Sequence, residues 1–170
     1  MPAWSPEIAN RFIVLASADG RALDQIQLQK LVYVAHGWCL AISGEPLTGD
    51  RPEAWEFGPV YRRLADALLA CGLEPVTNQL AEGAREESTT SDQKDAPDLD
   101  ELELDVIARI YHDYGAFSGS QLSNLTRRGN APWREIYADG RGKYREIPHR
   151  LIRAQFVQLA NRRSDRADFA

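Results

Sequence analysis

The strongest constraint on the fold of this 170-residue sequence is a stretch from Leu28 to Ile42 that would be apolar around almost the whole of a helix. Its main apolar stripe runs from Leu28 through Ala35 to Ile42, and Val34 and Trp38 fill other faces. Such a helix is stable in water only when neighbouring elements cover it on all sides. The sequence therefore predicts a central helix that begins near Asp24 and ends before Ser43-Gly44.

The remaining predicted elements are amphipathic helices bounded by capping and breaking residues. Ser5 is expected to cap the first helix, and Gly58-Pro59 to open the third. The helices are expected at about residues 5–18, 24–42, 59–71, 98–114, 118–128, 132–138 and 148–163. Between residues 46 and 57 the helical period is lost, which predicts a small β-hairpin that pairs Pro46-Leu47 with residues 54–57. The fold class is mainly α, a single compact multi-helix domain over residues 1–170.

Composition narrows the class of protein further. The chain is 44% hydrophobic and 26% charged with a net charge of -5, as expected of a globular protein and not of a general nucleic-acid binder. Residues 82–98 are acidic and polar without aromatic residues, which predicts a mobile segment. No apolar run approaches the roughly 20 residues that a membrane span requires. We expect a cytoplasmic protein with reduced cysteines.

Catalytic and metal-binding patterns are weak. The three histidines are far apart in sequence, and none has acidic or cysteine neighbours at metal-ligand spacing. Cys39 could be a nucleophile only with a base beside it, such as His36 one helical turn earlier. A lone cysteine on an apolar stripe more often behaves as a small hydrophobic residue. The sequence predicts no catalytic residue, no cofactor and no metal.

Charge is divided unevenly along the chain. Residues 85–105 contain nine acidic residues and two basic ones, whereas residues 127–166 contain eleven basic residues and four acidic ones. Aromatic residues such as Trp133 and Tyr144 lie among the basic ones. Arginine with aromatic residues is typical of protein interfaces and of nucleic-acid surfaces, and a solvated face that offsets the acidic segment explains the pattern equally well.

The segment around Gly58-Pro59 also has two interpretations. Trp55 and Phe57 could plug the end of the helical core, or they could belong to a binding surface. Tyr61, Arg62 and Arg63 are the better candidates for the surface. Lys30 lies within the apolar central helix, so its ammonium group must reach solvent or pair with a carboxylate, for which Glu53 and Glu56 are candidates.

Several motifs in a fixed order resemble the Panacea domain of SocA-like antitoxins. They are Leu28-Gln29-Lys30-Leu31-Val32-Tyr33, Pro46-Leu47, the stretch from Glu53 to Val60, the stretch from Leu122 to Thr126, and Pro132-Trp133. The resemblance covers about residues 7–138. The family usually has a histidine after the threonine that Thr126 matches, and this chain has Arg127 there.

The resemblance implies an antitoxin that binds a cognate, SocB-like toxin directly and has no enzymatic activity of its own. The family includes a branch whose members act as adaptors and deliver the toxin to the ATP-dependent protease ClpXP. The resemblance implies that this chain belongs to that branch. The residues expected to bind a partner are Lys30, Tyr33, Trp55, Phe57, Tyr61, Arg62, Arg63, Arg127, Arg128 and Trp133.

Four other functions stay open at this point. The short helices at 118–138 with their arginines are also typical of a DNA-binding regulator, although the acidic total argues against nucleic acid. An antitoxin could also block its toxin sterically without a protease. A pure scaffold or phage accessory role is a further alternative, and a hydrolase built on Cys39 or His36 is the least supported of the four.

Overall fold

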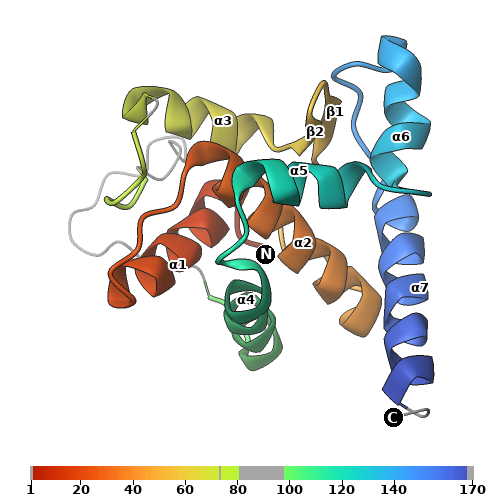
Figure 1. The fold of residues 1–170 in the computed structure, drawn as a ribbon, viewed down its shortest axis with the longest axis horizontal. Helices are drawn as coiled ribbons and strands as arrows, with labels where there is room; N and C mark the ends of the chain where they lie inside the picture. Colours follow the sequence, from red (N-terminus) through yellow and green to blue (C-terminus); the bar gives the residue numbers. More distant parts are fainter. Residues whose placement is uncertain (1, 73, 81–97, 168–170) are drawn as a thin grey trace.

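The computed structural model describes residues 2–72, 74–80 and 98–167, and in these it contains seven α-helices and one two-stranded antiparallel hairpin (Figure 1). The mainly α fold class with a small hairpin is thereby confirmed. The elements are α1 (Ser5–Ala18), α2 (Gln25–Ser43), β1 (Glu53–Trp55), β2 (Gly58–Val60), α3 (Arg62–Leu68), α4 (Glu101–Tyr114), α5 (Gly119–Arg127), α6 (Pro132–Tyr137) and α7 (His149–Ala167), with 3₁₀ turns at Leu69–Cys71 and Ala138–Gly140. Nearly all of the acidic segment predicted to be mobile, residues 82–98, lies outside the described residues.

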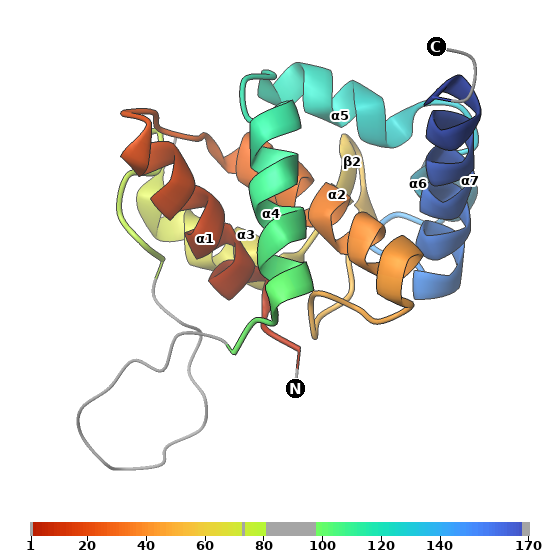
Figure 2. The same cartoon turned by 90° about the horizontal axis from the view of Figure 1, so that it is seen from below.

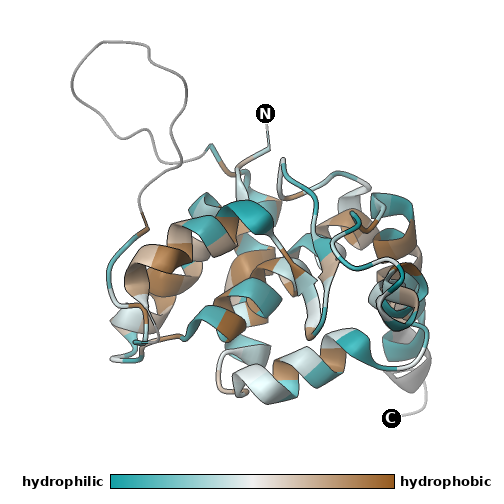
Figure 3. Ribbon diagram, turned by 90° about the horizontal axis from the view of Figure 1, so that it is seen from above, coloured by the Kyte–Doolittle hydropathy of each residue, from teal (hydrophilic) through white to brown (hydrophobic). Residues whose placement is uncertain are grey.

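The predicted central helix is α2. It packs against α1, α3, α4, α5 and α7, and Figures 1 and 2 show it in the middle of the molecule. Every residue from Leu28 to Leu40 is buried, as its apolar circumference predicts. Ile42 is the exception, because it lies in the last turn of the helix and is 57% exposed. The outer helices carry both apolar and polar residues along their length, as amphipathic helices do (Figure 3).

Helix boundaries follow their capping residues closely. The side chain of Asp24 accepts a hydrogen bond from the Gln27 backbone N–H at 2.7 Å, and Gly44 ends α2 in the left-handed conformation with φ 77°. Ser118 and Gln121 form the predicted capping box of α5. The expected cap at Ser5 is wrong, because Trp4 precedes the first helical residue and the Ser5 hydroxyl instead donates to Asp50 Oδ2 at 2.5 Å.

The Asp24 cap supports a measurable prediction. Replacing Asp24 with alanine leaves the Gln27 N–H without its side-chain acceptor and removes a negative charge from the positive end of the helix. We expect the free energy of unfolding to fall by about 1 kcal/mol, as for other N-cap residues. Urea titration followed by circular dichroism measures this change. Asp24→Asn, which keeps the accepting oxygen, is expected to recover most of the loss.

The hairpin exists, but its strands are not the predicted ones. β1 pairs with β2 in a register that places Ala54 opposite Pro59, and Phe57 lies in the turn between them. Pro46-Leu47 is not part of the hairpin, since Leu47 is buried in the core and the adjacent Thr48 forms a bridge with Ala3. Gly58 and Pro59 are therefore strand residues, and the following helix starts three residues after Pro59, at Arg62.

Helix α4 also differs in detail from expectation. α4 begins at Glu101 with Asp100 as its cap, three residues later than the expected start at 98, and Leu102 in its first turn is 36% exposed. The inward positions are Val106, Ile107 and Ile110.

No helix in the described part of the chain is long and apolar enough to span a membrane.

α7 packs along α2 through an aromatic contact that needs a glycine. The Phe156 ring lies over Gly37, where a Cβ atom would come within 2.3 Å of the ring carbon Cε2. Tyr33 and Trp38 meet the same ring edge-to-face, with centroid distances of 6.2 and 5.5 Å. The packing of α7 against α2 therefore requires a glycine at position 37.

Candidate functional site: a lysine-floored pocket beside the hairpin

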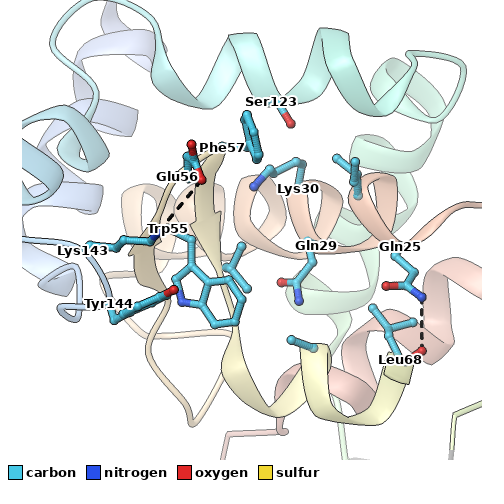
Figure 4. Close-up of a pocket in the computed structure, with 13 residues that line it drawn as sticks. Gln25, Gln29, Lys30, Trp55, Glu56, Phe57, Leu68, Ser123, Lys143 and Tyr144 are labelled. Atoms are coloured by element: carbon cyan, nitrogen blue, oxygen red, sulfur yellow. Dashed lines mark hydrogen bonds and ion pairs between the residues drawn. The ribbon is translucent and has the colours of Figure 1, made fainter. Parts of the chain in front are cut away.

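A pocket of about 350 Å³ lies between α2, the hairpin, α3, α5 and the loop that precedes α7 (Figure 4). This volume is in the lower part of the range of ligand pockets, roughly 300–1,000 Å³. Most of the surface that lines it is apolar, although six of the thirteen lining residues are polar or charged. The lining residues are Gln25, Ile26, Gln29, Lys30, Trp55, Glu56, Phe57, Val60, Ala65, Leu68, Ser123, Lys143 and Tyr144.

Lys30 forms the floor of this pocket. Only 2% of the residue is exposed, and its Nζ donates a hydrogen bond of 2.8 Å to the Pro59 carbonyl. Among the described residues no carboxylate forms an ion pair with it, so the predicted pairing with Glu53 or Glu56 is wrong. Burial, and secondly the positive charge of Arg127, lower the pKa of Lys30 to about 7.

Gly58 makes room for this ammonium group. Its φ of 119° lies in a region that side chains rarely adopt, and a Cβ there would come within 3.1 Å of Lys30 Nζ and 3.0 Å of Thr126 Oγ1. The Gly-Pro step noted in the sequence is therefore explained by the close approach of the β2 backbone to α2 and α5.

Gln29 holds the hairpin end against α2. Its side-chain amide accepts a hydrogen bond from the Tyr61 N–H at 2.8 Å and donates one to the Tyr61 carbonyl at 3.1 Å. Both backbone groups are buried, so Gln29 satisfies the backbone at the point where β2 ends and α3 is about to begin. This amide fixes the side of the pocket that α3 provides.

The opposite wall is built around Trp55. The Tyr144 ring meets it edge-to-face with a centroid distance of 5.3 Å, and the Arg62 guanidinium lies 5.3 Å from its centroid. The Trp55 indole N–H donates to Glu53 at 2.9 Å, and Glu53 also pairs with Arg62 at 3.1 Å. The Trp133 indole in turn donates to the Trp55 carbonyl at 2.6 Å. The wall is thus held in place before any partner binds.

The mouth of the pocket is amphipathic. Phe57 is 65% exposed at the tip of the hairpin, and Ile26 at the start of α2 is 50% exposed. Lys143 and Glu56 approach each other to 3.9 Å at the edge (Figure 4). Exposed apolar residues around a concave, ordered wall are typical of a surface that receives another molecule.

The structure divides the predicted partner-binding residues into groups. Lys30, Trp55 and Phe57 line the pocket, while Arg62 and Trp133 contact Trp55 from outside the lining. Tyr33 and Tyr61 are buried, so the expectation of Tyr61 at the surface is wrong. Its backbone is clamped by Gln29, and its hydroxyl lies in the core within 3.4 Å of Thr48 Oγ1.

The predicted arginines are spread over several places. Arg63 stacks on the Trp4 ring, with 3.8 Å from the guanidinium carbon to the centroid, and does not line the pocket. Arg127 lies 6.0 Å from the Trp133 centroid, and Arg128 lines a different groove. That second groove, about 400 Å³ between α2, α4, α5 and α7, also contains Arg162 and Arg163.

Ten of the thirteen lining residues were not predicted to bind a partner, and Gln29, Lys143 and Tyr144 are three of these. Gln29 stands next to Lys30 in a helix that is otherwise nearly apolar, and a second polar side chain there is a usable signal. Lys143 and Tyr144 follow a turn about 85 residues after the hairpin, and nothing local to them indicates where that turn lies. Their position is set by the backbone bonds from Ala54 N–H to Arg145 and from Tyr144 N–H to Ala54.

Cys39 and His36, the two residues considered for catalysis in the sequence, are poorly suited to it. Burial, together with nearby acidic groups, raises the pKa of the Cys39 thiol to about 12, and burial together with His149 lowers that of His36 to about 3. At neutral pH this thiol stays protonated, which makes it a poor nucleophile. His36 and His149 are neighbours in the fold, with ring centroids 4.8 Å apart. In the described residues, no group of three or more His, Cys, Asp or Glu is arranged to hold a metal ion.

Comparison with known proteins agrees with the resemblance noted in the sequence. The family model described as "Antitoxin SocA-like, Panacea domain" matches residues 28–134. The chain is also 30% identical over 144 residues to the protein named Antitoxin SocA from Caulobacter vibrioides (strain NA1000 / CB15N), an alignment that covers 79% of this chain and 70% of that protein. No solved structure matches. The matched region contains the hairpin, Lys30 and most of the pocket lining, and the chain belongs to the SocA-like antitoxin family defined by the Panacea domain.

Proposed function

We propose that this chain neutralises a SocB-like toxin protein in the cytoplasm by binding it directly at the lysine-floored pocket, without an enzymatic reaction. The observation that supports this most is the exposed Phe57 beside an ordered, largely apolar hollow. Preformed pockets flanked by aromatic residues are where interface energy concentrates. Membership of an antitoxin family makes a toxin the natural partner.

Phe57 is the sharpest test of this surface. Because it is 65% exposed, Phe57→Ala is expected to change the free energy of unfolding by less than about 0.5 kcal/mol. Binding to the product of the adjacent gene should weaken roughly 10- to 100-fold, as measured by calorimetry. Ile42→Ala is the matched control, since Ile42 is also exposed but lies at the far end of α2. If both variants bind the adjacent gene product with equal affinity, the pocket mouth is not part of the interface.

We further propose that the chain acts as an adaptor that delivers the toxin to the ClpXP protease. An adaptor needs two surfaces, and the groove that contains Arg128, Arg162 and Arg163 shares no lining residue with the pocket, although α2 and α5 border both. Holding cargo and protease together raises their effective concentration, so neither contact must be tight alone. The uneven charge of the C-terminal third supports the second surface.

The first experiment is co-purification of this chain with the adjacent gene product, followed by incubation of that partner with purified ClpXP and ATP. Faster loss of the partner when this chain is present, with the chain itself surviving, is the expected result. A stable complex whose partner is not degraded would replace delivery by steric neutralisation. Absence of any complex would overturn the proposal of direct toxin binding.

The DNA-binding alternative receives less support from the geometry. α5 packs on α2 and β2 with Leu122, Ser123 and Thr126 buried, and Trp133 of α6 is directed to the hairpin. A recognition helix must instead present a free face to the major groove. Binding to DNA whose affinity falls steeply with salt concentration would support this alternative, because contacts to phosphates release counterions from the DNA.

A further inference from the structure

The ammonium group of Lys30 has more hydrogen-bonding capacity than its surroundings use. A lysine carries three N–H donors, and the only bond recorded for Nζ in the described residues is the one to the Pro59 carbonyl. A buried cation without an anion is expensive unless a partner group satisfies it. The other charged group that acts on it, Arg127 on α5, is also positive.

Within the described parts of the chain, the titratable side chains around the pocket do not supply that anion. Glu53 in the hairpin is engaged by Trp55 and Arg62, and Glu56 in the turn is directed to Lys143 at the mouth. The loop before α7 contributes Lys143 and Tyr144, and the lining residues from α3 are apolar. The floor is therefore a basic amine without an acidic partner among the described residues, whereas the walls above it expose mostly apolar surface.

We propose that the toxin inserts an acidic side chain into this pocket, where it pairs with Lys30 while an adjacent apolar residue packs against Trp55 and Phe57. This inference rests on the proposed function and names the chemistry that its site recognises. The charge complementarity supports an anion, and the apolar walls support a side chain carried on a protein segment over a small free ion. Figure 4 shows Lys30 between Ser123 and the hairpin, beneath Phe57.

Such pairing has a consequence for pH. In the free chain the pKa of Lys30 is about 7, so the amine is largely neutral at pH 8. A carboxylate beside it favours the ammonium form and raises the pKa, so binding at pH 8 must take up a proton. Affinity should therefore fall as pH rises above 7, by up to about tenfold per pH unit, and should level off below 7.

The test is calorimetry of the full-length chain with the adjacent gene product, in buffers of different ionisation enthalpy. We expect uptake of about one proton per complex at pH 8 and close to none at pH 6. Lys30→Met should weaken binding by roughly 30-fold or more at pH 7 and abolish the pH dependence. Lys143→Met, the control at the mouth, should keep the pH dependence. One Asp→Asn or Glu→Gln change in the partner should reproduce the loss and not add to that of Lys30→Met.

The outcomes separate the two proposals. If a complex forms without proton uptake at pH 8, or if Lys30→Met binds as well as the wild type, the acidic anchor is overturned and direct toxin binding stands. If no complex forms at any pH, direct binding fails and this inference fails with it. Should Lys30→Met not fold, proton uptake by the wild-type chain decides the question by itself.

Discussion

Replacing Phe156 with alanine is expected to lower the free energy of unfolding by about 3–5 kcal/mol, among the largest effects of any single substitution in this chain. The ring is 5% exposed and is enclosed by Gly37, Tyr33 and Trp38 of the central helix. Its removal leaves a cavity between α2 and α7, because the surrounding backbone cannot collapse to fill it. Urea denaturation followed by tryptophan fluorescence measures the loss. Gln158→Ala, at an exposed position two residues later on α7, is the control and should stay within about 0.5 kcal/mol.

Gly37 provides the complementary half of this test. In the wild-type chain Gly37→Ala should destabilise by about 1–3 kcal/mol, because its methyl group would overlap the Phe156 ring. In the Phe156→Ala background the same change should be close to neutral or stabilising, since alanine favours a helix more than glycine does. The two effects are therefore expected to be strongly non-additive. Simple additivity would show that α7 does not rest on position 37.

Gln29→Met is expected to have the second large effect, a loss of about 2–4 kcal/mol. Methionine keeps the length of the side chain but leaves the Tyr61 N–H and carbonyl without partners in a buried place, at roughly 1–3 kcal/mol for each group. Thermal unfolding monitored by circular dichroism measures the change. Gln29→Glu preserves the acceptor for the Tyr61 N–H but places a buried carboxylate oxygen against the Tyr61 carbonyl, so a loss at least as large is expected. Stability within about 0.5 kcal/mol of the wild type in both variants would contradict the clamp.

Local signals were most reliable where a single residue type solves a local problem. Asp24, Gly44 and Ser118 mark helix ends because a side-chain acceptor or a left-handed residue is needed there. The predicted helix start at Gly58-Pro59 was wrong, although it rested on a similar local signal, since proline is common at the first position of a helix. Here the pair is strand β2, because the backbone must approach Lys30 and Thr126 more closely than any side chain permits.

The candidate site was recognised only in part. Trp55, Phe57 and Lys30 stood out as aromatic and charged residues in unusual positions, and all three line the pocket. The expectation for Tyr61 failed, because exposure of an aromatic residue depends on what packs over it and not on its neighbours in sequence. Lys143 and Tyr144 were missed because their place depends on backbone bonds to Ala54, about 90 residues earlier in the chain.

The sequence by itself determined that this chain folds as helices around one buried helix, because hydrophobic periodicity and capping are local properties that the chain carries in every conformation. The order of its motifs also determined the family. Tertiary structure alone decided which residues share the pocket and that, among the described residues, no carboxylate pairs with Lys30. Those facts arise from contacts between α2, the hairpin, α5 and the loop before α7, and such contacts exist only once distant segments pack together.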